Sequence, residues 1–302
     1  MPSLKNIALV GASGSIGEIL LTALIEAQEF KITVLSRTSS IATFPPGVTV
    51  RKSDFTHTDL REALTDQDAL ISAVGATGFA DQKTLINAAI DARVSRFIPS
   101  EFSADSQNDA VLALLPLFAQ KTEVIEYLRS KEKDITWTGI ACSGLFDWGI
   151  ANSFLSYDIA SRTATTWDSG DKKFTLTNQK QLGKALASVL RTPNATANQY
   201  LYISSVETTQ NEILEALQRA TGSNWTVQHT TTNAEVREGT AKLQKGDFSG
   251  ALALVRATAF GDVAGLESNY ARDKSLANEL LGLEEENVDE TIRRVVREAG
   301  HD

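Results

Sequence analysis

Cysteine and histidine are scarce in this sequence of 302 residues. The single cysteine, Cys142, excludes an intrachain disulfide, and the three dispersed histidines do not predict a metal site. No apolar run approaches the length of a membrane span. Because the first residues lead directly into a strand pattern, we expect no signal peptide and a cytoplasmic protein without a membrane partner.

Basic residues are also fewer than acidic ones. The sequence has 29 lysines and arginines against 38 aspartates and glutamates, a formal net charge of −9. Proteins that bind nucleic acid usually present basic surfaces, so this balance argues against a nucleic-acid partner. The hydrophobic content of 42% is typical of a soluble globular protein. Monomer and homodimer both remain open.

The first half alternates apolar strand-like segments with amphipathic ones. Strands are expected at 6–10, 31–36, 48–52, 69–74, 96–99 and 135–140, and helices at 15–28, 80–92 and 115–130. Short, nearly continuous apolar strands separated by helices predict a parallel sheet that is covered on both faces. We therefore expect an α/β fold, a Rossmann doubly wound sheet, over residues 1–146.

The pattern becomes less regular after residue 146. Helices are expected at 182–190, 210–221 and 284–298, with a strand at 200–204. We predict a smaller, less regular α+β substrate lobe over residues 147–302, in which the strand near 200–204 is a candidate to rejoin the main sheet.

Three glycines, Gly11, Gly14 and Gly17, lie between the first strand and the first helix. This is the context that the dinucleotide-binding fingerprint requires, because a tight turn brings backbone N–H groups and a helix N-terminus to the pyrophosphate. The alternative is a tight turn without a ligand. The cofactor contacts expected from this loop are Gly11, Ser13, Gly14, Ser15, Ile16 and Gly17.

The end of the second strand distinguishes between the two common dinucleotides. NAD-binding proteins usually carry an acidic residue there, which accepts the ribose hydroxyls. Here the sequence places Arg37 among serines and threonines, without an acid. Arginine suits a 2′-phosphate through charge-assisted hydrogen bonds, so NADP(H) is favoured over NAD(H). The alternative for Arg37 is a solvated loop charge.

Two further segments are candidates to line the cofactor. Asp54 and Phe55 follow the third strand and are predicted to contact the adenine, although Asp54 would also serve as a helix N-cap. Val74 and Gly75 follow the fourth strand, at the edge of the sheet along which such cofactors extend.

Two lysines compete for a catalytic role. Tyr127 and Lys131 match the Tyr-x-x-x-Lys spacing of short-chain dehydrogenases, but Lys131 lies in a charged helix end that is normally solvated. Lys121 lies near the start of the same helix with apolar neighbours, so a partly buried lysine with a lowered pKa is possible. From position alone, an exposed helix lysine is the favoured interpretation of Lys121.

The segment Arg96-Phe97-Ile98-Pro99-Ser100-Glu101-Phe102 resembles the signature of the isoflavone reductase-like family, which groups with NmrA-like proteins among atypical short-chain dehydrogenases. Residues 135–148, Gln82, residues 209–212 and Trp225 extend the resemblance, which is strongest to fungal members. It implies NADPH as hydride donor and Lys121 as catalytic lysine, with Leu117 where ordinary short-chain enzymes carry tyrosine. We expect the nicotinamide to lie against Val74, Gly75, Ser100, Glu101 and Phe102.

The sequence departs from plant members of this family at two places. The loop after Arg37 lacks a second basic residue, and Ile125 replaces a basic residue four positions after Lys121. The hypothesis is a reductase with Lys121 as general acid or base, acting on a small aromatic, quinoid, enone or imine substrate. Phe146, Trp148 and Phe154 are predicted to contact the substrate, with core packing as their alternative. A redox sensor that binds NADP(H) without turnover is the rival function.

Overall fold

The computed structural model describes residues 4–300, which divide into two compact units, each built from three stretches of chain. The first unit takes Met1–Phe102, Ala119–Ile140 and Leu182–Leu201, and the second takes Ser103–Phe118, Ala141–Gln181 and Tyr202–Asp302. This differs from the single boundary predicted after residue 146. Residues 182–201 belong to the first unit, because they supply a strand to its sheet and a helix beside that sheet.

The first unit is built on a sheet of seven strands in the order β11-β6-β5-β4-β1-β2-β3. The strands are β1 (Asn6–Val10), β2 (Lys31–Arg37), β3 (Thr49–Ser53), β4 (Ala69–Ser72), β5 (Arg96–Ile98), β6 (Thr136–Ala141) and β11 (Gln199–Tyr202). β1 pairs in parallel with both β2 and β4, so Ala8 lies opposite Thr33 on one side and Leu70 on the other. The predicted Rossmann sheet is confirmed, and the strand predicted near residue 200 joins its edge.

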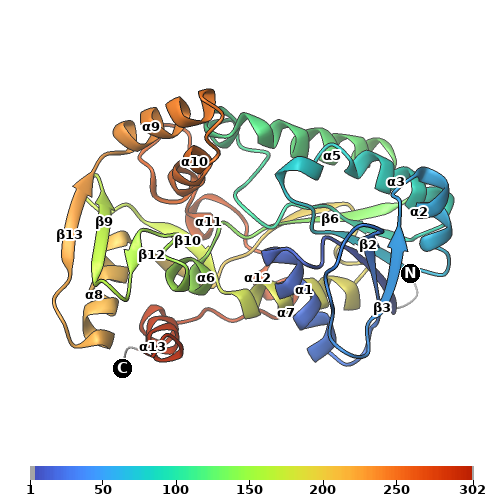
Figure 1. Cartoon of the computed structure of the whole chain (residues 1–302), viewed down its shortest axis with the longest axis horizontal. Coiled ribbons are helices and arrows are strands. Elements are labelled where there is room, and N and C mark those ends of the chain that lie inside the picture. The colour runs from blue at the N-terminus through green and yellow to red at the C-terminus, as the bar shows by residue number, and fades with distance from the viewer. Residues whose placement is uncertain (1–3, 301–302) are drawn as a thin grey trace. The chain divides into compact units, whose positions relative to one another are not determined.

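Helices cover both faces of this sheet (Figure 1). One layer contains α2 (His57–Ala63), α3 (Gln82–Asp91) and α5 (Ala119–Ser130), and the other contains α1 (Ser15–Glu26) and α7 (Gln179–Arg191). Alternate residues of a strand face opposite sides, so Ala8 and Val10 pack into the core beneath the first layer with Leu85 and Ile125. In the other layer α1 and α7 approach closely, because a Cβ on Gly183 would lie 2.4 Å from the Ala23 Cβ.

The second unit contains two small sheets, β12-β10-β7 and β13-β9-β8. Its strands are β7 (Gly144–Leu145), β8 (Tyr157–Asp158), β9 (Thr163–Trp167), β10 (Phe174–Thr177), β12 (Val206–Thr208) and β13 (Thr226–Thr230). Its helices are α4 (Asp109–Leu114), α6 (Phe146–Ala151), α8 (Gln210–Thr221), α9 (Thr232–Gln244), α10 (Ser249–Phe260), α11 (Tyr270–Asp273), α12 (Asn278–Leu281) and α13 (Val288–Glu298). Trp167 packs edge-on against Phe260 in its core, with ring centroids 5.0 Å apart.

Two predicted helices begin four residues later than expected. The helix expected from residue 115 is interrupted by a short 3-10 turn, η2 (Pro116–Phe118), and α5 starts at Ala119. The last helix starts at Val288, where the Asn287 side chain accepts a hydrogen bond from the Glu290 N–H. Between residues 4 and 300, no helix is long and apolar enough to cross a membrane.

Candidate functional site

The loop between β1 and α1 needs two of its three glycines for steric reasons. Gly11 has φ +83°, and a Cβ there would lie 2.4 Å from the Ala73 carbonyl oxygen. A Cβ on Gly17 would lie 2.0 Å from the Gly11 carbonyl oxygen. Gly14 is different, because its Cβ would meet only the Gly11 oxygen, at an ordinary 3.5 Å. The loop is therefore tightly packed at Gly11 and Gly17 and has free space beside Gly14.

The N-terminus of α1 adjoins this free space. Gly14 is the N-cap residue, in an extended conformation with φ −90° and ψ 163°, and it has no side chain with which to cap the helix. The first N–H groups of any helix have no partner within the helix, and they carry partial positive charge. The α1 N-terminus is thus suited to an anionic group that binds beside Gly14.

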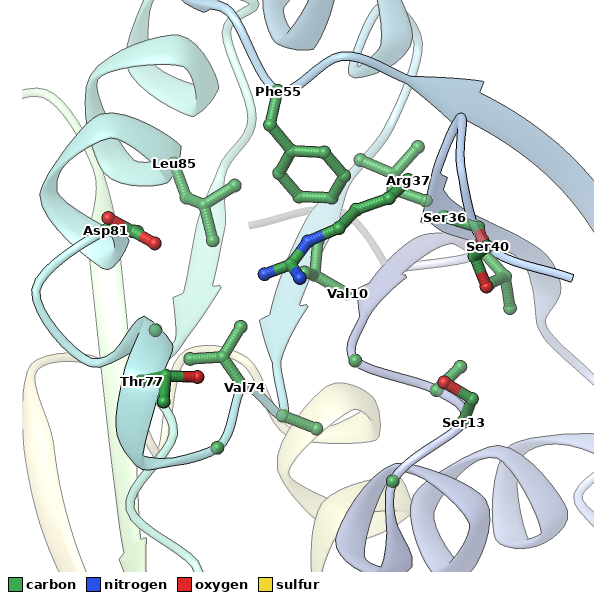
Figure 2. A pocket seen from close by; sticks show the side chains of 18 of the residues that line it. Val10, Ser13, Ser36, Arg37, Ser40, Phe55, Val74, Thr77, Asp81 and Leu85 are labelled. Carbon is green, nitrogen blue, oxygen red and sulfur yellow. The ribbon is translucent and has the colours of Figure 1, made fainter. Parts of the chain in front are cut away.

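A cavity of about 650 Å³ lies at the carboxyl ends of β1, β2 and β4. Of the cofactor residues predicted from the sequence, those that line it are Gly11, Ser13, Gly14, Arg37, Phe55, Val74 and Gly75. Figure 2 shows the Arg37 side chain extending into the cavity below the Phe55 ring, with Thr77 and Asp81 on a separate wall. A cavity of this size, with a basic side chain inside it, suits a phosphorylated small molecule.

Several lining residues were not predicted because no sequence motif marks them. They lie at the end of β2, in the loop after it, in a 3-10 turn and at the start of α3. The most polar of them are Ser36, Ser39, Ser40, Thr77, Asp81 and Thr84, and Phe44 adds a second aromatic ring. Ser39, Ser40 and Phe44 come from the loop after β2, and the others on the opposite wall come from η1 (Ala76–Gly78) and the start of α3.

Asp54 has a structural part in the turn before α2. Its carboxylate accepts hydrogen bonds from the Thr56 N–H at 2.9 Å and the Thr56 hydroxyl at 2.7 Å. These bonds lower the pKa of Asp54 below its usual value. Thr56, rather than Asp54, is the N-cap residue of α2. Asp54 does not line the cavity, whereas its neighbour Phe55, with φ +63°, does.

A second cation, Lys52, lies beside the Arg37 loop. It stands on β3 opposite Ser36 of β2. Its Nζ donates to the Ser40 carbonyl oxygen at 2.6 Å and to the Ser36 hydroxyl at 3.5 Å. Only the register between β2 and β3 brings this lysine to the loop, so its position was not predicted from the sequence.

Ser100 fixes the wall of the cavity at the end of β4. Its hydroxyl donates to the Val74 carbonyl oxygen at 2.7 Å, and its N–H donates to the buried Gln82 side chain at 2.8 Å. Ser100, Glu101 and Phe102 do not line the cavity themselves, nor do Ser15, Ile16 and Gly17. Ser100 therefore supports the wall through its hydrogen bond to Val74 without facing the cavity.

Lys121 is buried, with 3% of its surface exposed, in the first turn of α5. Its Nζ donates to the Glu101 carbonyl oxygen at 2.7 Å and lies 4.8 Å from the centre of the Phe79 ring. Phe79 directly follows Gly78, which lines the cavity. Position alone favoured an exposed Lys121, so its burial is a finding of the structure. Lys121 does not itself line the cavity; it contacts Phe79, whose neighbour Gly78 does.

The rival pair lies elsewhere on α5. The Tyr127 hydroxyl donates to the Asn87 side-chain oxygen at 2.6 Å, and the Lys131 Nζ lies 5.4 Å from the centre of the Tyr127 ring. Neither residue lines the cavity. The spacing thus brings the two side chains together, but not at the candidate site.

The predicted substrate residues all lie in the second unit and differ in exposure. Phe146 is fully buried at the start of α6, which is the core-packing alternative, so we do not retain it as a substrate contact. Trp148 and Phe154 are half-buried, with ring centroids 5.5 Å apart. These two rings keep surface that a ligand can reach.

Comparison with known proteins identifies the family of the chain. The model of the NmrA-like family matches residues 3–259. The chain belongs to the NmrA-like family. It is 36% identical over 296 residues to Oxidoreductase aprR of Aspergillus flavus, covering 97% of this chain and 99% of that protein. It is 32% identical over 290 residues to Oxidoreductase poxI of Penicillium oxalicum, and this match covers 95% of this chain and 92% of that protein.

The fold is similar to that of solved reductases. In the binary complex of leucoanthocyanidin reductase with NADPH from Vitis vinifera, the match covers 97% of this chain and 99% of that one, with a TM-score of 0.79 and 17% identity. The predicted family is confirmed, and both of these relatives are named oxidoreductases.

Proposed function

We propose that this NmrA-like protein is an NADPH-dependent reductase that transfers hydride to an electrophilic carbon of a small aromatic, quinoid, enone or imine substrate. The observation that carries the proposal is the α1 N-terminus, which has no side-chain cap and adjoins a cavity of about 650 Å³ that Arg37 enters. The relatives named oxidoreductases and the NADPH complex of similar fold support the same class.

The residues present fit NADPH. The free space beside Gly14 accepts the pyrophosphate, because a Cβ there would have only one ordinary contact. Arg37 and Lys52 supply two positive charges for the 2′-phosphate, and Phe55 offers an aromatic face to the adenine. When bound, NADPH would supply the hydride for the reduction.

The other residues would orient the nicotinamide and the substrate and would supply a proton. Ser100 holds the Val74 carbonyl, so the wall of the cavity at Val74 and Gly75 is rigid when the nicotinamide binds against it. Lys121 would deliver a proton to the substrate oxygen or nitrogen as the electron pair moves onto it. Trp148 and Phe154 are candidate contacts for an aromatic substrate, since each keeps part of its ring exposed.

The test separates binding from turnover. Titration of the protein with NADPH and with NADH, followed by the change in nicotinamide fluorescence, measures both affinities. Consumption of NADPH is then followed with quinones, enones, imines and aromatic ethers. We expect tighter binding of NADPH and turnover with at least one class. Tight binding without turnover by any class would instead favour the redox sensor, and absence of binding would overturn both functions.

A further inference from the structure

Glu101 lies next to the candidate catalytic lysine and is buried, with only 1% of its surface exposed. It follows β5 by three residues. Its backbone carbonyl oxygen accepts the hydrogen bond from the Lys121 Nζ at 2.7 Å. Its carboxylate Oε2 accepts a hydrogen bond from the Tyr200 hydroxyl at 2.8 Å. One residue thus connects the lysine with a tyrosine that is distant from it in the sequence.

The sheet leaves space for the Tyr200 side chain. Tyr200 stands on β11, which lies beside β6 at the edge of the sheet. A Cβ on Gly139 of β6 would lie 2.8 Å from Tyr200 Cδ2 and 3.5 Å from Glu101 Cγ. Because β6 has no side chain at this position, the Tyr200 ring crosses it and its hydroxyl reaches the carboxylate. The contact therefore depends on two strands of the first unit, β6 and β11, and on the segment that follows β5.

We propose that Tyr200 is a positioning residue for Lys121 and acts through Glu101. This inference rests on the proposed function, in which Lys121 protonates the substrate. A buried carboxylate is costly unless it is hydrogen-bonded, so the Tyr200 hydroxyl favours one rotamer of Glu101. That rotamer fixes the peptide plane whose carbonyl oxygen orients the ammonium group. Small displacements of a catalytic group cost rate, and binding of the cofactor depends on other residues.

The deciding variant is Tyr200→Phe, which keeps the ring against Gly139 and removes only the hydroxyl. The matched control is Tyr127→Phe, which removes a hydroxyl that is bonded to Asn87 at 2.6 Å in the same unit but away from the cavity. Gly139→Ala is the second variant, because its methyl group displaces the Tyr200 ring and leaves the hydroxyl present.

The first readout does not need turnover. In protein labelled with ¹⁵N-lysine, the Lys121 ammonium should give a protected resonance, because it is buried and hydrogen-bonded. We expect its exchange with solvent to accelerate about tenfold or more in Tyr200→Phe and Gly139→Ala, and to stay unchanged in Tyr127→Phe.

The second readout is the split between kcat and KM, measured with the best acceptor from the panel above. We expect kcat of Tyr200→Phe to fall about ten- to hundredfold, while KM for NADPH and the unfolding temperature change no more than in Tyr127→Phe. An unchanged Lys121 resonance, or equal kcat values in the two tyrosine variants, would overturn the inference. If the wild-type protein binds no NADPH, the proposed function fails, and the resonance still decides whether Tyr200 positions Lys121.

Discussion

The carbonyl oxygen of Gly11 lies where a side chain on Gly17 would begin, since a Cβ on Gly17 would be 2.0 Å from that oxygen. The first turn of α1 is thereby held against the end of β1, and no other residue type fits at Gly17 without movement of the backbone. Gly14, between these two residues, has no such constraint. We therefore expect the three glycines of the loop to have separable roles in folding and in binding.

Gly17→Ala should destabilise the protein, whereas Gly14→Ala should weaken NADPH binding alone. The methyl group at residue 17 forces the loop to shift, at a cost of about 1–3 kcal/mol in the free energy of unfolding. At residue 14 the methyl group fits the protein but fills the space expected for the pyrophosphate, so we expect at least about tenfold weaker NADPH binding. Urea unfolding and NADPH titration measure the two effects. Equal affinities of wild type and Gly14→Ala would refute the pyrophosphate placement.

Arg37→Asp should reverse the preference between NADPH and NADH. The substitution removes a charge-assisted partner of the 2′-phosphate and adds an acceptor for the ribose hydroxyls, so we expect about 10- to 100-fold weaker NADPH binding. Lys52→Met should weaken NADPH binding about tenfold with little change for NADH. Lys31→Met, at the other end of β2, is the control. An unchanged ratio of the two affinities in both variants would show that neither cation reads the 2′-phosphate.

Lys121→Met should abolish turnover while NADPH still binds. We expect kcat to fall by about two to four orders of magnitude, the usual contribution of a proton-transferring side chain. Lys131→Met should stay within about twofold of the wild-type rate, because Lys131 lies beyond the last turn of α5, with its Nζ against the Tyr127 ring. The measurement is steady-state NADPH oxidation together with the dissociation constant for NADPH. If Lys131→Met loses activity and Lys121→Met does not, the assignment of the lysines is reversed.

Arg96→Lys should lower stability without affecting specificity for the cofactor. The Arg96 guanidinium is fully buried and donates to Thr138 Oγ1 at 2.6 Å, to Thr196 Oγ1 at 3.2 Å and to the Pro193 carbonyl oxygen. Burial lowers the pKa of Arg96 to about 10. A lysine cannot reach all of these acceptors, so we expect a loss of about 2–4 kcal/mol.

Chemical denaturation measures this loss. The control is Arg93→Lys at an exposed position, which should change stability by less than about 0.5 kcal/mol. Equal stability of the two variants would mean that the buried guanidinium contributes little to the fold.

The sequence was most informative where one local pattern decides the structure. β1 was predicted with its observed bounds, because a short apolar run ends at a glycine turn. The glycine loop and Arg37 were predicted to line the cofactor site, because their roles follow from adjacent residues. The register that brings Lys52 to Ser36 and the 99-residue separation of Tyr200 from Glu101 leave no local pattern, so these contacts emerged only from the fold.

Helices α9 and α10 were missed for another physical reason. Each contains a glycine, Gly239 in the interior of α9 and Gly250 in the first turn of α10, and glycine lowers helix propensity. In the structure these glycines let the two helices pack closely, since a Cβ on Gly250 would lie 2.2 Å from the Gly239 carbonyl oxygen. Each glycine thus lowers the stability of its own helix and at the same time allows the two helices to pack together.

The return of residues 182–201 to the first unit has a consequence during synthesis of the chain. α7 supplies Gly183, which approaches Ala23 of α1, and β11 closes the open edge of β6. A ribosome that has translated only the first 146 residues has made every strand of the sheet except the last. The emerging chain then still exposes apolar surface of α1 and an unpaired strand edge, both of which promote aggregation. The first unit is therefore completed only after about two thirds of the protein has been translated.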